Sequence, residues 1–245
     1  MSCKCAVVIP ARYASSRFPG KPLAMLSGKP MIQHVYEKAT ASRAALVLVA
    51  TDDQRIADAV TSFGGTPVMT RSDHPSGTDR IAEAVSRSCP DIDIVINVQG
   101  DEPLIPTSAI DDLLALMEAH PEYDMATIAV PGSREQMTEN NVKVVFGADG
   151  RALYFSRALI PFARSGGVPD QVWLHWGIYA YRRVALERFV ALPPGRLERS
   201  EMLEQLRALE NGMRIQVMTS TLQSIGVDTP DDLVKAEQRL MEAGK

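Results

Sequence analysis

The feature that most limits the fold of this chain is a regular alternation, through its first half, of short apolar runs with amphipathic helical stretches. The apolar runs are rich in β-branched residues and have the length of buried strands. They occupy residues 5–10, 45–51, 66–70 and 93–98. The stretches with helical spacing start near residue 30 and cover residues 53–63 and 79–88. Strands that alternate with helices form βαβ units, so this half predicts a parallel sheet covered by helices on both faces.

The second half continues the pattern but contains more strands. A helix begins at Thr107, whose hydroxyl makes a favourable N-cap. Further strands are predicted over residues 124–130, 142–146, 173–182 and 214–220, with helices over about 200–210 and from Pro230 onward. We therefore predict an α/β fold with a doubly wound mixed sheet of the Rossmann-like kind and a smaller β-rich lobe over about residues 125–215. At 245 residues, the chain suits a single domain over residues 1–245.

Composition excludes several classes of protein. With 45% hydrophobic and 23% charged residues, the chain has the make-up of an ordinary folded globule and not of a disordered chain. No run of about 18 apolar residues occurs and no signal peptide is recognisable, so we expect no membrane insertion and a cytoplasmic location. A net charge of -4 gives no basic excess, so we expect no nucleic-acid partner.

The strongest candidate for a ligand site is the loop over residues 10–22, PARYASSRFPGKP, which follows the first predicted strand. In open α/β sheets, ligands bind beyond the carboxyl ends of the strands. Arg12, Arg17 and Lys21 can converge on phosphate oxygens there. The first acidic residue of the chain is Glu37, so no acid neutralises these cations locally. The loop matches neither a Walker A motif nor G-x-G-x-x-G, and a solvated basic loop is the alternative interpretation.

Two aspartates follow other short apolar runs. Asp101 lies in NVQGDEPLIP after the strand predicted over 93–98, and Asp228 lies in IGVDTP near the C-terminus. Mg²⁺ binds one or two protein carboxylates together with substrate phosphates, so each aspartate is a candidate metal ligand. The alternatives are that Asp101 is an acidic turn residue and that Asp228 caps the helix that follows it.

These segments belong to a longer series of motifs that runs almost from end to end. In order they are IPARYASSRFPGKPL, ATDD, MTRSDHPSGTDR, INVQGDEPLIP, VKVVF, ALYFSRALIPF, HWGIYAYR, LERSEMLEQLR and GVDTPDDL. In these motifs and their order the chain resembles the 3-deoxy-manno-octulosonate (Kdo) cytidylyltransferases. The resemblance implies a nucleotide-diphospho-sugar transferase fold, a homodimer, and transfer of CMP from CTP to Kdo with Mg²⁺, giving CMP-Kdo and pyrophosphate for lipopolysaccharide synthesis.

The resemblance also assigns roles to individual residues. The implied triphosphate contacts are Arg12, Ser15, Arg17 and Lys21, and the other nucleotide-binding residues are Arg71, Ser76, Gly77, Arg80 and Gln99. The implied metal ligands are Asp101 and Asp228, and the catalytic residues are Arg12, Lys21, Asp101 and Asp228. The implied sugar-binding residues are Gln99, Arg157, His175, Tyr179, Glu204 and Gln205. The β-rich lobe is expected to bind the sugar and form the dimer.

The residue chemistry is compatible with that reaction. Nucleotidyl transfer needs charge neutralisation around three phosphates and a stabilised pyrophosphate leaving group, which three cations and Mg²⁺ would supply. The nucleophile is the anomeric hydroxyl of the sugar, so no covalent enzyme intermediate is needed. By spacing alone, His175 and Tyr179 read as core residues, and Glu204 and Gln205 read as part of a solvated helix face. Two other functions stay open: a cytidylyltransferase for a sialic-acid-like keto-deoxy acid, and a non-catalytic nucleotide-binding regulator.

Overall fold

The computed structural model describes residues 4–14, 18–164, 166–167, 169, 171–222 and 224–243. The chain divides into two compact units, which are described in turn. The first consists of Met1–Leu114 together with Gln223–Lys245, and the second is Ala115–Leu222. The β-rich lobe predicted over about residues 125–215 falls within the second unit.

The first unit contains a parallel sheet with strand order β6-β1-β4-β5. The strands are β1 (Cys5–Ala11), β4 (Leu46–Thr51), β5 (Pro67–Met69) and β6 (Ile94–Asn97). β1 lies between β6 and β4, and the apolar residues of β1 are buried along its whole length. This burial on both faces explains why the strand reads as a continuous apolar run.

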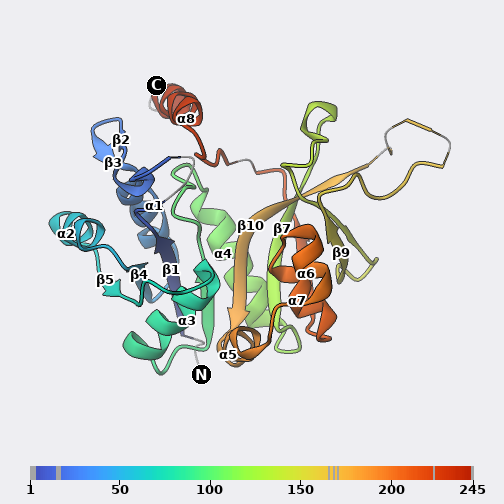
Figure 1. The fold of residues 1–245 in the computed structure, drawn as a ribbon, viewed down its shortest axis with the longest axis horizontal. Coiled ribbons are helices and arrows are strands. Elements are labelled where there is room, and N and C mark those ends of the chain that lie inside the picture. The colour runs from blue at the N-terminus through green and yellow to red at the C-terminus, as the bar shows by residue number, and fades with distance from the viewer. Residues whose placement is uncertain are drawn as a thin grey trace. The chain divides into compact units, whose positions relative to one another are not determined.

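Helices connect these strands and cover both faces of the sheet, as Figure 1 shows. They are α1 (Met31–Thr40), α2 (Gln54–Ser62) and α3 (Gly77–Ser88). The start of α4 (Thr107–Ala119) lies beside α1, because the Thr107 hydroxyl donates to the Lys38 carbonyl at 3.1 Å. The chain adds β4 and then β5 on one side of β1, and then crosses back to add β6 on the other side. Because all these connections are right-handed, the return crossing places α3 on the face of the sheet opposite α1. The predicted doubly wound α/β fold is thereby confirmed.

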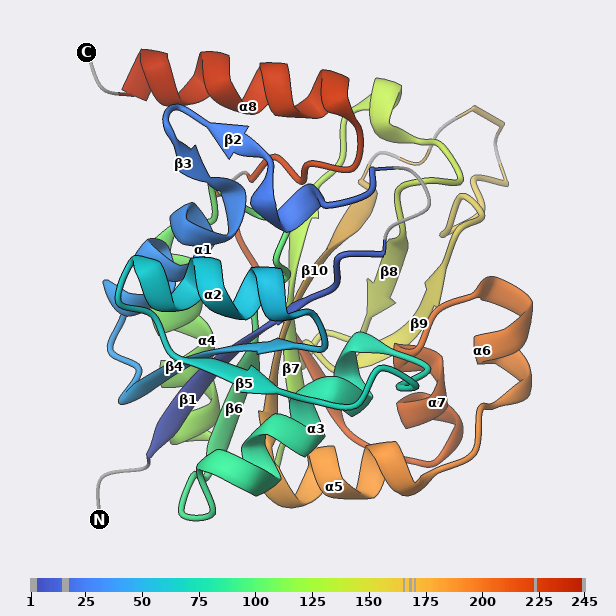
Figure 2. The same ribbon diagram turned by 60° about the vertical axis from the view of Figure 1, so that its left-hand side comes forward.

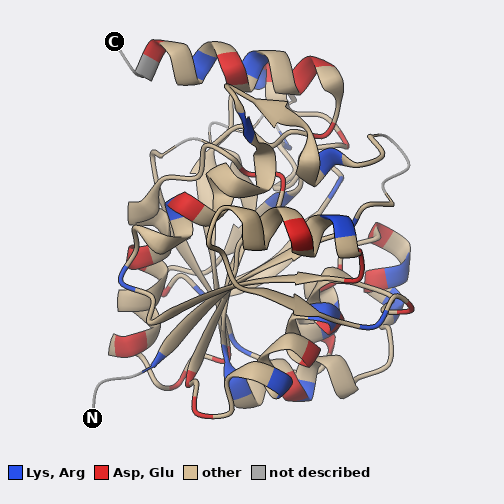
Figure 3. Cartoon of the chain, turned by 90° about the vertical axis from the view of Figure 1, so that its left-hand side faces the viewer, with Lys and Arg blue, Asp and Glu red and all other residues tan. Residues whose placement is uncertain are grey.

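The C-terminal helix α8 (Pro230–Ala243) returns to the first unit and covers a small hairpin. The hairpin is formed by β2 (Met25–Leu26) and β3 (Lys29–Pro30), which follow the short helix η1 (Lys21–Leu23), and α8 runs along it in Figure 2. The shared core consists of Leu26, Met31, Val227 and Ala236, with Phe18, Leu104, Leu233 and Leu240 packed around it. Acidic and basic residues are spaced along α8 (Figure 3), while Leu233, Ala236 and Leu240 pack into this core, so the helix is amphipathic.

The second unit is built on strands in the order β11-β7-β10, with β8 paired to β10 and β9 paired to β8. The strands are β7 (Met125–Pro131), β8 (Lys143–Phe146), β9 (Ala152–Ser156), β10 (Trp173–Arg182) and β11 (Ile215–Thr219). β7 pairs parallel with β11 and antiparallel with β10. The short helix η2 (Arg134–Gln136) follows β7.

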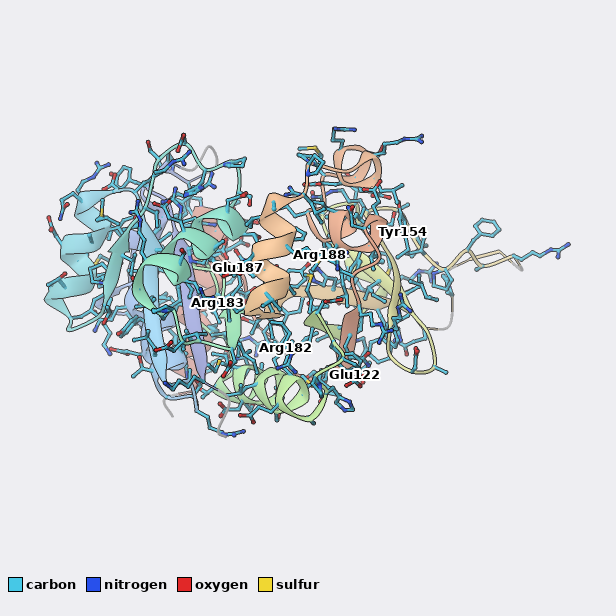
Figure 4. All side chains as sticks on the ribbon, turned by 90° about the horizontal axis from the view of Figure 1, so that it is seen from below. Glu122, Tyr154, Arg182, Arg183, Glu187 and Arg188 are labelled. Carbon is cyan, nitrogen blue, oxygen red and sulfur yellow. The ribbon has the colours of Figure 1, made fainter. Side chains whose placement is uncertain are left out.

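Among the described residues, three helices follow β10 within the second unit: α5 (Arg183–Ala191), α6 (Arg196–Glu201) and α7 (Gln205–Glu210). The single helix predicted over about 200–210 is wrong in its start, because Met202 adopts a left-handed conformation (φ 54°) and separates α6 from α7. Arg182, labelled in Figure 4, donates to the carbonyls of Met117 and His120 and so satisfies acceptors at the end of α4. Within the described residues, no helix has the length and apolarity needed to cross a membrane.

Candidate active site

The first part of the site is the turn that leads from β1 into η1. Gly20 has φ 71°, a left-handed conformation that glycine adopts without strain. Its amide donates to the Tyr13 carbonyl at 2.9 Å, and its carbonyl accepts from Leu23 at 2.8 Å. This turn makes Lys21 the first residue of η1, beyond the carboxyl end of β1.

The second part is the turn after β6, which lies against the end of β1. A Cβ atom at Gly100 would come within 2.8 Å of the Pro10 carbonyl oxygen, so the close approach requires glycine. The turn is closed by the Glu102 amide, which donates to the Gln99 carbonyl at 3.2 Å. Asp101 is therefore fixed next to the end of β1.

The third part is the segment that precedes α8. Val227 is fully buried, and its amide donates to the Asp101 carbonyl at 2.8 Å. The amides at the start of α8 are satisfied by its neighbours: the Thr229 amide donates to Asp232 at 3.1 Å, and the Asp232 amide donates to the Thr229 hydroxyl at 3.3 Å. Thr229 and Asp232 thus cap the helix, whereas the Asp228 side chain reaches towards η1.

The three parts bring Lys21 between two carboxylates. Its Nζ atom lies 2.7 Å from Asp101 Oδ2 and 3.2 Å from Asp228 Oδ1. The lysine side chain is 13% exposed, whereas Asp101 and Asp228 are 32% and 47% exposed. Two carboxylates around one ammonium leave a net negative charge at an accessible position. Asp101 and Asp228 are 80 and 207 positions away from Lys21 in the sequence, so it is the fold that brings the three residues together.

Arg12 and the start of α3 lie at the same end of β1. The Arg12 guanidinium donates to the His74 carbonyl at 3.2 Å. Ser76 is the N-cap of α3, and its hydroxyl accepts from the Asp79 amide at 3.2 Å. A Cβ atom on Gly77 would lie 3.5 Å from the Pro10 ring. Arg12, which belongs to the predicted phosphate loop, is thus held near the amide end of α3, and both groups are favourable to anions.

Arg80 and Arg71 differ sharply in environment. Arg80 is fully buried, donates to the Thr70 hydroxyl at 2.6 Å and forms an ion pair with Asp52 at 3.2 Å. Arg71 is exposed and pairs with Asp73 at 2.7 Å. These contacts make Arg80 a support beneath the strand ends, and the predicted nucleotide-binding role of both residues stays a prediction.

Three further nucleotide-site predictions concern Gln99, Ser15 and Arg17. The Gln99 amide donates to the Asn97 side chain at 3.3 Å, beside the turn that carries Asp101. Ser15 and Arg17 lie outside the described residues. Gln99 is thus near the charged cluster, within the first unit.

In the second unit, Arg157 follows β9 and is held by main-chain acceptors. Its Nε donates to the Glu201 carbonyl at 2.8 Å, its Nη1 to Glu139 at 3.2 Å and its Nη2 to Met202 at 3.4 Å. The ammonium group of the buried Lys143 donates to the Arg157 carbonyl. These contacts use three of the five guanidinium N–H donors in a fixed orientation.

Glu201 supports this region although its position in the sequence predicts no functional role. Its carboxylate accepts from the Ser156 hydroxyl at 2.7 Å, the Arg157 amide at 2.9 Å and the Tyr154 hydroxyl at 3.4 Å. Burial alone would raise the pKa of the Glu201 carboxyl, but the hydrogen bonds from Ser156 and Arg157 outweigh it and lower the pKa. Glu201 therefore stays ionised and joins the end of β9 to the end of α6.

His175 and Tyr179 lie together on β10 with their rings 5.2 Å apart. Burial lowers the pKa of His175 to about 3, so the imidazole is neutral near pH 7. Burial, with the nearby Tyr181 and Glu204, raises the pKa of the Tyr179 phenol well above its usual value. Both groups are therefore neutral hydrogen-bonding partners in a largely apolar setting.

Glu204 and Gln205 lie at the turn between α6 and α7. Gln205 is buried and begins α7, and Glu204 is half-buried close enough to Tyr179 to affect its titration. Arg157 donates to the carbonyls of Glu201 and Met202, which precede Glu204 in this turn. The turn thus lies close to both Arg157 and Tyr179. Their binding roles stay predictions.

Comparison with known proteins identifies the class of this protein. Residues 6–215 match the model of the cytidylyltransferase family, so the chain belongs to that family and is a nucleotidyltransferase. The predicted enzyme class is confirmed.

Individual relatives extend the comparison over almost the whole chain. It is 53% identical over 240 residues to the 8-amino-3,8-dideoxy-manno-octulosonate cytidylyltransferases of Shewanella sp. strain ANA-3 and Shewanella oneidensis, covering 96% of this chain and 97% of each relative. The structure of a CMP:2-keto-3-deoxy-manno-octonic acid synthetase complexed with CTP matches with a TM-score of 0.92 and 44% identity, over 98% of this chain and 99% of that one. A putative glucose-1-phosphate thymidylyltransferase from Bacillus anthracis shares the fold, with a TM-score of 0.69 at 14% identity over 96% of this chain and 94% of that one.

Proposed function

We propose that the protein transfers CMP from CTP to the anomeric hydroxyl of a 3-deoxy-manno-octulosonate, with release of pyrophosphate. The observation that carries the proposal is the contact of Lys21 with both Asp101 and Asp228 beyond the carboxyl end of β1. This arrangement provides a cation for phosphate oxygens and two carboxylates for a divalent ion at the place where α/β sheets bind ligands. The names of the relatives support CTP and an eight-carbon 3-deoxy sugar acid as the substrates.

Arg12 and Lys21 would bind the triphosphate and stabilise the charge that develops on the departing pyrophosphate. Asp101 and Asp228 would hold Mg²⁺, because two converging carboxylates with a net negative charge provide the oxygen ligands that this ion prefers. When bound, the ion would offset the charge of the triphosphate. The anomeric hydroxyl is then the nucleophile, and no side chain needs to form a covalent intermediate.

Arg157, His175 and Tyr179 would bind the sugar acid. An arginine with a fixed guanidinium suits the carboxylate of the sugar, because charge-assisted hydrogen bonds to carboxylates are strong and directional. The neutral imidazole and phenol suit sugar hydroxyls, which need paired donors and acceptors in a dry environment.

Two sugar acids are candidates, Kdo and its 8-amino derivative. The Shewanella relatives are named for the 8-amino form, and the synthetase complexed with CTP is named for the form that carries a hydroxyl. The wider biological proposal is a homodimeric cytoplasmic enzyme that supplies an activated sugar for lipopolysaccharide synthesis, with the second unit forming the dimer.

The test is pyrophosphate release with Mg²⁺ and each sugar acid, run with CTP, UTP and ATP. We expect release with CTP and at least one of the two octulosonates, and little with a sialic-acid-like acid. CTP binding without pyrophosphate release from any sugar acid would instead identify a non-catalytic nucleotide-binding protein.

The same assay tests the metal ligands. Asp101→Asn should lower turnover by about a hundredfold or more while the unfolding midpoint changes little, because it removes charge stabilisation of the transition state. Asp58→Asn, at an exposed position on α2, is the matched control and should behave as the wild type. Near-normal turnover of Asp101→Asn at limiting Mg²⁺ would reject this assignment.

A further inference from the structure

Thr127 is a buried hydroxyl on β7 that contacts three groups of the neighbouring strand β10. Its Oγ1 atom lies 3.0 Å from His175 Nε2, 2.8 Å from the Ile178 carbonyl oxygen and 3.2 Å from the Trp176 carbonyl oxygen. The residue is fully buried, so water does not substitute for these contacts. A single hydroxyl therefore connects a predicted sugar-binding side chain to the main chain of its own strand.

The main-chain contacts coincide with an irregularity in the pairing of β10. Trp176 is opposite Ile128, and the next pair is Tyr179 opposite Thr127, so two residues of β10 are unpaired between them. Such a bulge redirects side chains along a strand. The bulge lies between His175 and Tyr179 in the sequence of β10, and the rings of these two residues are 5.2 Å apart. The Thr127 hydroxyl thus fixes the part of β10 that sets the spacing of these two rings.

The same contacts favour one tautomer of His175. A threonine hydroxyl has one proton to donate, and a carbonyl oxygen only accepts. With the Ile178 carbonyl at 2.8 Å, that proton is directed to the main chain. The hydroxyl oxygen then accepts from His175, so Nε2 is protonated and Nδ1 keeps its lone pair as an acceptor.

Two aromatic rings that pack against His175 restrict the rotation of its imidazole. Phe155 meets it edge-on with ring centroids 5.1 Å apart, and Tyr179 lies against it at a tilt of 43°. Because burial keeps the imidazole neutral near pH 7, the choice of tautomer decides whether Nδ1 donates or accepts.

We propose that Thr127 is a positioning residue of the sugar-acid site: its hydroxyl holds His175 in the Nε2–H tautomer and fixes the bulge, so that Nδ1 accepts a hydrogen bond from a sugar hydroxyl beside Tyr179. This inference rests on the proposed function. It assigns to Thr127 no contact with the substrate, and its effect is transmitted through His175.

The experiment compares Thr127→Val, which keeps the shape but removes the hydroxyl, with Thr127→Ser, which keeps the hydroxyl. Thr219→Val, at an exposed position on β11, is the matched control. In pyrophosphate-release assays, Thr127→Val should raise KM for the sugar acid about tenfold, the equivalent of one hydrogen bond, and leave KM for CTP within about twofold. Thr127→Ser and Thr219→Val should stay close to wild type.

A second readout needs no substrate. Nitrogen-15 NMR of labelled histidine in the wild-type protein should show a protonated Nε2 and a bare Nδ1 for His175, identified by its loss in His175→Gln. Thr127→Val should show a mixture of tautomers.

Wild-type His175 protonated at Nδ1 would overturn the proposal, whether or not Thr127→Val folds. So would a folded Thr127→Val that keeps both the wild-type tautomer and the wild-type KM for the sugar acid. If the wild-type protein releases no pyrophosphate with any sugar acid, the proposed function fails, and the NMR result shows separately whether Thr127 sets the tautomer.

Discussion

The ion pair between Glu198 and Arg207 should be a major contributor to the stability of the second unit. Arg207 Nη2 and Nε donate to the two carboxylate oxygens at 2.6 and 2.9 Å, and the Gly195 amide donates to the same carboxylate at 2.9 Å. The side chains are only 7% and 10% exposed. Arg207 also donates to the Leu192 carbonyl and lies over the Phe189 ring at 4.8 Å. The pair joins α6 to α7, on either side of the turn that carries Glu204.

Replacing Arg207 with Met should leave a buried carboxylate without its partner. Breaking a buried pair from one side costs about 3–5 kcal/mol. For a chain of this size, each kcal/mol lowers Tm by about 2–4 °C, so we expect a decrease of about 6–20 °C. Replacing both residues, as in Glu198→Leu with Arg207→Met, should recover much of this loss, because no charge is then buried alone.

The contribution of the Glu198–Arg207 pair to stability should depend on pH. Burial would raise the pKa of Glu198, but the hydrogen bonds from Arg207 and Gly195 outweigh it and lower the pKa in the folded protein. The pair therefore stabilises the wild type above the pKa of an unfolded glutamate, and this stability is lost as the pH falls through the lower folded pKa. The difference in Tm between wild type and Arg207→Met should shrink from pH 7 towards pH 4.

Scanning calorimetry of the two proteins at several pH values measures these quantities. Arg183→Met, which removes an exposed pair with Glu187 one turn along α5, is the control and should change the free energy of unfolding by about 0.5 kcal/mol or less. A Tm of Arg207→Met within about 2 °C of that control at pH 7 would refute the reasoning.

Three further predictions follow from the site and its supports. Lys21→Ala should raise KM for CTP about tenfold or more, because charge-assisted hydrogen bonds to phosphate are lost; an unchanged dependence of pyrophosphate release on CTP concentration would contradict this. His175 has a folded pKa of about 3 and an ordinary one of 6.5, so the wild type should lose stability as the pH falls between these values. His175→Gln should remove up to about 1.4 kcal/mol of this loss per pH unit in denaturant titrations, and an unchanged pH dependence would contradict this. Gly100→Ala should lower the free energy of unfolding by about 1–3 kcal/mol, since its Cβ would lie 2.8 Å from the Pro10 carbonyl oxygen; an unchanged Tm would disprove this close approach.

The sequence predicts best those elements whose burial is uniform. β1 and β6 are buried on both faces, so their apolar runs mark them almost to the residue. β9 was not predicted, because it has five residues of mixed exposure. α5 begins at Arg183, directly after the last residue of β10, with no turn residue to mark its start. The break at Met202 lacks the glycine or proline that usually signals one.

The candidate site was predictable where the chemistry lies close to a strand end. Lys21 and Asp101 follow strands and have side chains suited to phosphate and metal, so position and residue type agree. Glu201 and Thr127 were not predictable in this way, because their roles arise from contacts with residues 44 or more positions away in sequence. A glutamate on a helix and a threonine on a strand carry no local signal of such contacts.

The return of the last residues to the first unit has a consequence for synthesis of the protein. All four strands of the parallel sheet are made before residue 115, but Asp228 and the α8 residues that pack on Leu26 come after the whole second unit. The strands of the parallel sheet are therefore synthesised early, whereas the cluster of Lys21, Asp101 and Asp228 is complete only when translation is nearly finished. Premature termination near residue 222 would remove Asp228, one carboxylate of the cluster, together with the α8 residues that pack on Leu26.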